Sequence, residues 1–337
     1  MTSRFLKKIL CLLLFCGMCT MKQQVVAASK AEPVDYVNPY MGNISHLLVP
    51  TYPIVHLPNS MLRVYPQRGD YTSGKLHGLP VLQISHRGSF VFNLSPFQGD
   101  ETDLARVMDY DYDNEVVKPY YYKVYLADHD VTTELVPTER AVMFRFTYPE
   151  TKNAYVIVDA FDKGSYVKVI PEENKIIGYS TKNSGGVPEN FKNYFVIQFD
   201  KPFTFVSTVS ENNILPNETE AKGNHTGAVI GFATKKGEIV HARVASSFIS
   251  PEQAELNLKE LGKNSFDQLV ANGREIWNRE MSKIEIEDDN IDNLRTFYSC
   301  LYRSMLFPRS FYEIDAKGQV MHYSPYNGEV RPGYMFT

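Results

Sequence analysis

Between residues 34 and 249, apolar residues either alternate with polar ones or run without interruption in short segments. Alternation is typical of a strand with one buried face, and a short apolar run of a strand buried on both faces. No helical spacing separates the segments, so the pattern favours a mainly β fold, a large antiparallel two-sheet β-sandwich, over a βαβ fold. The predicted strands are residues 61–65, 81–85, 90–94, 120–127, 131–136, 142–148, 154–159, 166–170, 194–199, 203–207, 228–233 and 239–245.

The spacing changes at Ser250, which precedes Pro251 at the first helical position and Gln253 at the capping-box position. Ser265 and Gln268 repeat this signature. The helix after it has its apolar residues on one stripe, and a further helix is predicted over residues 291–306. The stripe of that last helix consists of Ile291, Leu294, Phe297, Tyr298, Leu301, Tyr302, Met305 and Leu306. It is wider than a surface helix needs, so we expect it to be covered by helices that this chain does not contain.

Four parts follow from these patterns. Residues 1–28 are a predicted signal peptide, 29–249 a β-sandwich domain, 250–286 linker helices, and 287–337 the start of an incomplete helical domain. The tail, residues 307–337, contains three prolines and is predicted to be irregular loop.

The N-terminus has the order of an export signal. Basic residues precede the apolar segment 9–21, which is too short to cross a bilayer core of about 30 Å, and the small residues 26–28 suit a cleavage site. We therefore expect a periplasmic, extracellular or surface location. A lipoprotein signal is the alternative, because Cys16 and Cys19 lie in or beside the apolar segment. No later apolar stretch is long enough to span a membrane.

Composition narrows the classes of function. The net charge of −4 over 337 residues gives no basic footprint for nucleic acid. Only Cys300 lies outside the predicted signal, so neither a disulfide framework nor a cysteine zinc site is expected. We expect Cys300 to be a buried, inert thiol.

Three places have residues suited to a polar ligand. A proline-rich loop contains His46, and Ser85, His86 and Arg87 follow an apolar strand. The His-Arg pair could donate hydrogen bonds to ligand hydroxyls, or it could tie down a turn at a sheet edge. Arg309, after a helix and a proline, could reach a cleft between domains, or it could be an ordinary cation at a helix C-terminus.

Carboxylates form a second kind of candidate. Asp109, Asp111 and Asp113 alternate with Tyr110 and Tyr112, which on a strand would place the three carboxylates on one face. A calcium site is conceivable, but the EF-hand spacing is absent, so a solvated edge is favoured. Phosphate-binding glycine loops and the common zinc-protease and serine-hydrolase motifs are also absent from the sequence.

Several segments together resemble glycoside hydrolase family 92, the calcium-dependent exo-α-mannosidases. Residues 37–42, Val-Asn-Pro-Tyr-Met-Gly, resemble the opening of that family, and residues 244–254 its last sandwich strand and linker. Residues 277–286, beginning Trp-Asn-Arg-Glu, and residues 297–308, Phe-Tyr-Ser-Cys-Leu-Tyr-Arg-Ser-Met-Leu-Phe-Pro, resemble the two helical patterns that follow. The resemblance covers the mature chain and is most specific from about residue 240 to 312.

The resemblance implies a sandwich joined by linker helices to an (α/α)6 barrel, with the active site between them. It implies inverting, calcium-assisted hydrolysis of terminal α-linked mannose in glycans. The catalytic carboxylates and the calcium ligands would lie beyond Thr337, so no catalytic residue is assigned, no metal ligand is named, and the isolated chain is expected to be inactive. The implied substrate contacts are His46, Ser85, His86, Arg87 and Arg309.

The sequence departs from the family in both substrate loops. The glycines usual before and after the histidine are missing around His46, and a second histidine is missing after His86. Since glycine permits close approach of the backbone to a ligand, the pocket should be reshaped. Two alternatives stay open: a non-catalytic carbohydrate-binding protein derived from the same sandwich, and a phosphorylase or lyase relative with similar architecture.

Overall fold

The computed structural model describes residues 31–41, 53–68, 73–83, 90–100, 107–160, 163–183 and 185–337. The predicted signal peptide lies outside these residues and stays a prediction. Most described residues between 75 and 247 belong to antiparallel strands, which confirms the mainly β fold. Within the described ranges, none of the helices has the length and apolar character that a bilayer crossing requires.

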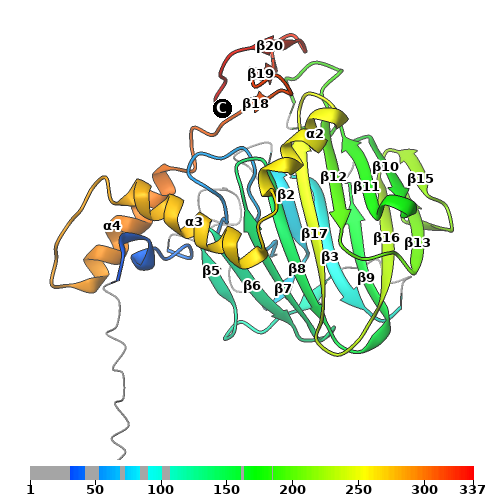
Figure 1. Cartoon of the computed structure of the whole chain (residues 1–337), viewed down its shortest axis with the longest axis horizontal. Coiled ribbons are helices and arrows are strands. Elements are labelled where there is room, and N and C mark those ends of the chain that lie inside the picture. The colour runs from blue at the N-terminus through cyan, green and yellow to red at the C-terminus, as the bar shows by residue number, and fades with distance from the viewer. Residues whose placement is uncertain are drawn as a thin grey trace, which may run out of the picture. The chain divides into compact units, whose positions relative to one another are not determined.

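Two antiparallel sheets make up the sandwich (Figure 1). Among described residues the larger has the order β15-β10-β11-β12-β17-β8-β7-β6-β5, and the smaller β14-β13-β16-β9-β3-β2. The larger sheet comprises β15 (Glu220–Gly223), β10 (Ser165–Ile170), β11 (Lys175–Ser180), β12 (Asn193–Phe199), β17 (Glu238–Ser247), β8 (Ala141–Tyr148), β7 (Val131–Pro137), β6 (Tyr121–Leu126) and β5 (Val116–Lys118). The smaller comprises β14 (Asn213–Pro216), β13 (Phe205–Ser210), β16 (Thr226–Thr234), β9 (Thr151–Asp159), β3 (Phe90–Gln98) and β2 (Leu79–Gln83).

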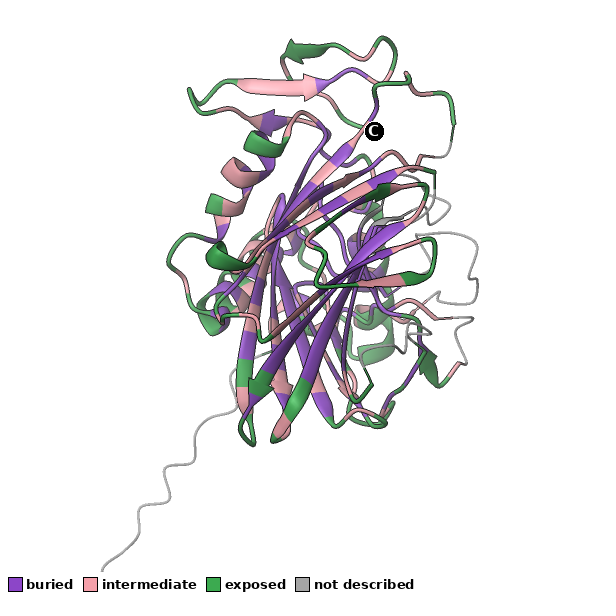
Figure 2. Ribbon diagram, turned by 90° about the vertical axis from the view of Figure 1, so that its right-hand side faces the viewer, coloured by how far each residue is buried: buried purple, intermediate pink, exposed green. Residues whose placement is uncertain are grey.

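The core lies between these sheets, where inward-facing residues are buried along each strand (Figure 2). Phe92 of β3 stacks on Phe195 of β12 with ring centroids 4.4 Å apart, which joins the two sheets. In β6 every second residue is buried, as the alternation of apolar and polar residues in the sequence predicts. Burying a side chain as large as Phe92 or Phe195 contributes about 1.5–3 kcal/mol to the free energy of unfolding. The core between the sheets therefore stabilises the sandwich.

The helices α2 (Pro251–Leu258) and α3 (Phe266–Met281) cover the outer face of the larger sheet. Their starts are as predicted. Ser250 Oγ accepts a hydrogen bond from Gln253 N, and Ser265 and Gln268 form a complete capping box. Between the two helices lies the short η4 (Lys259–Leu261), and η1 (Pro33–Tyr36) and η3 (Pro171–Glu173) are single turns elsewhere.

The last helix, α4 (Ile291–Ser304), is covered on one flank. Tyr298 and Tyr302 are buried against α3, whereas Phe297 and Leu301 are half-buried and Ile291 is 48% exposed. The expectation that helices outside this chain cover the stripe is therefore wrong for the flank with Tyr298 and Tyr302, and it stays a prediction for the flank with Ile291.

Three sequence expectations are wrong in detail. Cys300 is exposed, because it lies about 200° around the helix from Tyr298. The tail is not irregular throughout, since β18 (Glu313–Ile314), β19 (Val320–Tyr323) and β20 (Val330–Pro332) form a small sheet. The Asp-Tyr-Asp-Tyr-Asp segment is not one strand: β4 (Met108–Asp109), paired with β1 (Lys75–Leu76), ends at its first aspartate.

Candidate functional site

Strands β2 and β3 flank the residues where three of the predicted substrate contacts lie. Residues 84–89 connect β2 to β3, and Gln83 at the end of β2 pairs with Phe90 at the start of β3. Of the five predicted residues, only Arg309 belongs to the described part of the chain, so the role of the others stays a prediction. Those others are His46, Ser85, His86 and Arg87.

Residues 53–68 run beside β2. Predicted in part as a strand, this segment forms only isolated bridges, one of them the antiparallel bridge from Val64 to Val81 of β2. Because the two segments are antiparallel, residues 61–62 lie at the end of β2 where Gln83 precedes the candidate loop.

The turn before residue 61 joins this strand end to the end of α4. Asn59 N donates to Met305 O at 2.9 Å, and Ser310 N donates to Asn59 O at 2.8 Å. The end of β2 and the segment that contains Arg309 therefore lie together, although they are more than 200 residues apart in the sequence. The fold brings Arg309 to the strand end that precedes Ser85.

Two buried arginines occupy this junction, and we call Arg63 and Arg309 the arginine pair. Arg63 Nη2 donates to the carbonyl oxygen of Leu306, and its guanidinium lies 4.5 Å from the ring centroid of Phe307. Arg309 Nε donates to Thr337 Oγ1 at 3.2 Å. Burial lowers the pKa of Arg309 to about 10. Burial and the charge of Arg309 lower the pKa of Arg63.

The environment of Arg63 favours an acceptor that the described residues do not supply. Its side chain is almost fully buried, and within the described ranges Nε has no hydrogen-bond partner and no carboxylate shifts its pKa. A buried cation gains most from a charged or strongly polar acceptor placed against it. The pair can therefore hold a carboxylate, or orient hydroxyl oxygens, that reach this junction.

A buried aromatic cluster holds the junction in place. Trp277 Nε1 of α3 donates to His56 O at 2.7 Å, and the hydroxyl of Tyr302 in α4 donates to Ile54 O. The ring of His56 contacts both, with its centroid 5.2 Å from that of Trp277 and 5.6 Å from that of Tyr302. Burial, with the charge of Arg63, lowers the pKa of His56, so the imidazole is neutral and structural.

A buried ion pair joins Arg68 to Glu115. Arg68 Nη2 and Glu115 Oε1 are 2.5 Å apart, and the hydroxyl of Tyr122 donates to the same oxygen at 2.6 Å. The hydroxyl of Tyr40 donates to the other oxygen. Three donors on its two oxygens hold Glu115 in place, which fits a structural role for the pair.

Of the residues at these two places, only Arg309 was predicted from the sequence. Arg63 stands alone in an apolar segment, and an unexplained cation at such a position was the one available signal. The Arg68–Glu115 pair joins residues 47 positions apart, which no local pattern reveals.

The described residues do not fit a calcium site. Lys75 Nζ binds Asp109 at 2.7 Å, and Asp111 accepts hydrogen bonds from the backbone N–H groups of Asp113 and Asn114. Within the described ranges, no group of three histidine, cysteine or acidic residues could hold a metal. Asp111 shapes a turn, as aspartate commonly does at such positions.

Comparison with protein families gives two adjacent matches. Residues 36–247 match the N-terminal domain of glycosyl hydrolase family 92, and residues 253–337 match the catalytic domain of the same family. An uncharacterized secreted glycosidase of Arthroderma benhamiae is 22% identical over 233 residues, covering 61% of this chain and 30% of that protein.

Solved structures show the same similarity. A family GH92 inverting mannosidase of Bacteroides thetaiotaomicron is 36% identical, with a TM-score of 0.86 over 92% of this chain and 44% of its own. A family GH92 α-mannosidase of the same organism is 27% identical, with a TM-score of 0.80 over 92% of this chain and 46% of its own. The latter has also been solved with mannoimidazole. This chain thus spans less than half the length of these relatives.

Proposed function

This chain belongs to glycosyl hydrolase family 92, and we propose that it forms the N-terminal sandwich and linker of an exported exo-α-mannosidase. The substrate would be a glycan with terminal α-linked mannose. Similarity to two mannosidases and to a secreted glycosidase supports this proposal. The observation that carries it is the unbroken order of the two family matches, from sandwich to the start of the catalytic domain.

The catalytic carboxylates of the proposed enzyme lie in a helical domain that continues past Thr337. An inverting glycosidase needs two carboxyl groups about 6.5–9.5 Å apart, with the attacking water between one of them and the sugar. The half-buried flank of α4 offers apolar surface on which such a domain can pack. Packing there would bring the domain next to the arginine pair, since Arg309 follows α4 closely in the chain.

Substrate binding in this proposal is shared by two sides of the junction. His46, Ser85, His86 and Arg87 contribute hydrogen bonds to sugar hydroxyls from the sandwich. Arg309 and Arg63 act from the buried side of the junction. Both guanidinium groups are buried, so we give them the role of positioning the sugar. Oriented donors of this kind hold the sugar for attack without taking part in proton transfer.

Calcium is the cofactor that the family resemblance implies. The described residues offer no ligand set for it, so its ligands would lie elsewhere in the protein. We assign no step of the reaction to it.

The test uses the protein from its complete coding sequence and α-linked mannobiose. We expect mannose release without added phosphate, and we expect His86→Ala to lower kcat/KM by at least about a hundredfold while Tm changes little. His77→Ala, an exposed histidine before β2, is the control and should leave both unchanged. Unchanged kinetics in His86→Ala would remove this residue from the site, and absence of mannose release would refute the proposed activity.

A further inference from the structure

Three tyrosines form a row across the far edge of the larger sheet. Tyr166 of β10 pairs with Tyr179 of β11, which pairs with Tyr194 of β12, so all three side chains lie on the same face. The rings of Tyr166 and Tyr179 stack with centroids 5.5 Å apart, and Tyr194 meets Tyr179 edge-on at 6.1 Å. Tyr179 is therefore held in a fixed orientation by a tyrosine on each side.

An open pocket of about 530 Å³ lies beside Tyr179. Its walls include the ring of Tyr179, the side chains of Thr181, Lys192 and Lys222, and the backbone of Gly164 and Gly223. Thr181 Oγ1 donates to Gly164 O at 3.0 Å, which fixes the wall at the start of β10. The volume is sufficient for one or two sugar units.

Two lysines, Lys192 and Lys222, contribute positive charge to the pocket. Lys192 Nζ lies 4.4 Å from the centroid of the Tyr179 ring, and Lys222 is exposed at the rim. Across the residues that the structure describes, neither lysine has a carboxylate within ion-pair distance. Two carboxylates lie nearby: Glu220 interacts with Tyr166 and lies 4.0 Å from Lys168, and Glu211 accepts hydrogen bonds from two backbone N–H groups.

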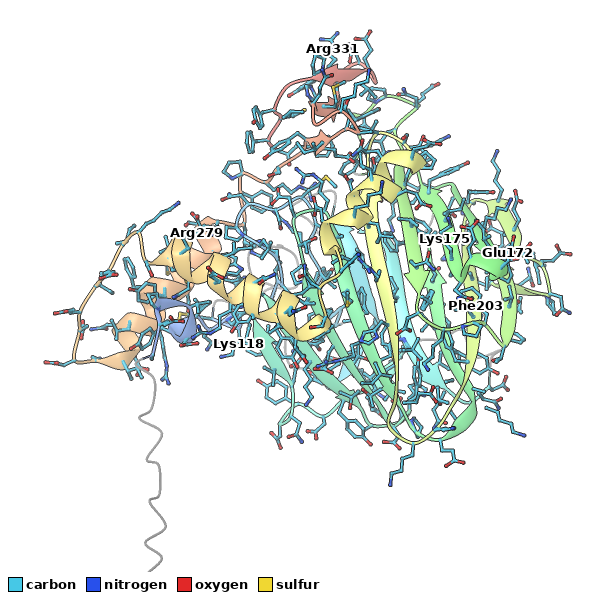
Figure 3. All side chains as sticks on the ribbon, in the orientation of Figure 1. Lys118, Glu172, Lys175, Phe203, Arg279 and Arg331 are labelled. Atoms are coloured by element: carbon cyan, nitrogen blue, oxygen red, sulfur yellow. The ribbon has the colours of Figure 1, made fainter. Side chains whose placement is uncertain are left out.

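This pocket is separate from the junction at the end of α4. It lies on β15, β10 and β11, at the opposite edge of the larger sheet from β5 and β6. In Figure 3, Glu172 beside β10 and Arg279 of α3 lie on opposite sides of the molecule. A ligand bound here would leave the junction free.

We propose that the pocket is a second carbohydrate site, which binds a sugar unit bearing an anionic group. The sugar would contact the edge of the Tyr179 ring, since Tyr166 stacks on that ring and Lys192 lies over it. A phosphate, sulfate or carboxylate group would lie between Lys192 and Lys222. We expect tight binding to need both the sugar and the anionic group. The anionic group would bind the two lysines, and the sugar would contact the aromatic wall beside them. The site would retain acidic glycans on the sandwich, independently of the hydrolysis proposed above.

The test is calorimetric titration of this chain at low salt with mannose 6-phosphate, mannose and inorganic phosphate. We expect the sugar phosphate to bind at least about tenfold more tightly than either other probe, since each lacks one of the two contacts. Affinity should fall as salt is added. Equal binding of mannose, equal binding of inorganic phosphate, or no binding of the sugar phosphate would each overturn the proposal.

Variants locate the site. Lys192→Gln with Lys222→Gln should weaken sugar phosphate binding at least about tenfold, whereas Lys236→Gln, an exposed lysine in the turn between β16 and β17, should not. Tyr179→Phe should retain binding and Tyr179→Leu should lose it, with Tm recorded for each variant to confirm folding. Wild-type affinity in the double lysine variant would place the ligand elsewhere and overturn the assignment.

Discussion

The sandwich and the last helix differ in how completely they bury their apolar residues. Inside the sandwich, Phe92 and Phe195 are at most 1% exposed and contact each other across the two sheets. On α4, Tyr302 is equally buried, but Ile291 on the same apolar stripe is 48% exposed. The sandwich closes its core within this chain, whereas α4 closes only the flank that faces α3.

The difference shows which part of the chain buries its apolar surface without another element. A closed two-sheet core accounts for stability, because its apolar surface is removed from water inside the chain. A half-covered apolar flank instead marks a surface that gains free energy when another element packs on it. Substitutions inside the sandwich should therefore mainly lower the stability of this chain. Substitutions on the open flank of α4 should matter mainly in the complete enzyme.

The largest effect on stability is expected inside the sandwich. Phe195→Ala should lower the free energy of unfolding by about 3–5 kcal/mol, because it leaves a cavity opposite Phe92. Phe195→Leu should cost much less, since most of the volume is retained. Urea titration measures both, and a loss under 1 kcal/mol in Phe195→Ala would show that the two sheets do not depend on this contact.

A smaller effect is expected on the covered flank of α4. Tyr302→Phe removes the hydroxyl that binds Ile54 O and leaves a buried carbonyl unpaired. The expected loss is about 1–3 kcal/mol by the same urea titration. Tyr112→Phe, at an exposed tyrosine, serves as the control with no expected change. Equal stability of the two variants would mean that the bond from Tyr302 to Ile54 O does not stabilise α4 on residues 53–68.

The stability of the larger sheet should depend on pH through Glu134 of β7. Burial alone would raise the pKa of Glu134, but hydrogen bonds from Arg145 and Tyr121 outweigh it, so the pKa lies below the ordinary 4.5. Its contribution is therefore present above pH 4.5 and is lost as pH falls through the folded-state pKa. Glu134→Gln should cost about 1–2 kcal/mol at neutral pH and progressively less in acid. A pH-independent difference in thermal unfolding would contradict this.

The smallest effect on stability is expected on the open flank of α4. Ile291→Ser should change the free energy of unfolding of this chain by less than about 0.5 kcal/mol, because the side chain is already half in water. In the complete enzyme the same change should lower Tm, since the flank would be covered there. Equal tolerance in both contexts would show that nothing packs on this flank.

Much of the fold could be predicted from local patterns. Alternation in β6 and the capping box at Ser265 are encoded within a few residues, and both appear as expected. The small sheet β18–β20 escaped prediction, because its strands are short and partly exposed and depend on pairing with one another.

The candidate site was less predictable. Arg309 was identified as a candidate, but its burial and its proximity to Arg63 depend on contacts between segments far apart in sequence. The tyrosine row could not be predicted from any local pattern either. Tyr166, Tyr179 and Tyr194 lie on three strands, and only the register of the sheet brings them together. His86 lies outside the described residues, so its role rests on family resemblance.

The central proposal is that the complete protein hydrolyses an α-mannoside with the aid of this sandwich. Time-resolved proton NMR of the complete protein with α-linked mannobiose tests it directly, because the first anomer of the product reports the mechanism. The predicted result is β-mannose as the first product, in buffer free of phosphate. Formation of mannose 1-phosphate, of an unsaturated sugar or of no product would contradict the account.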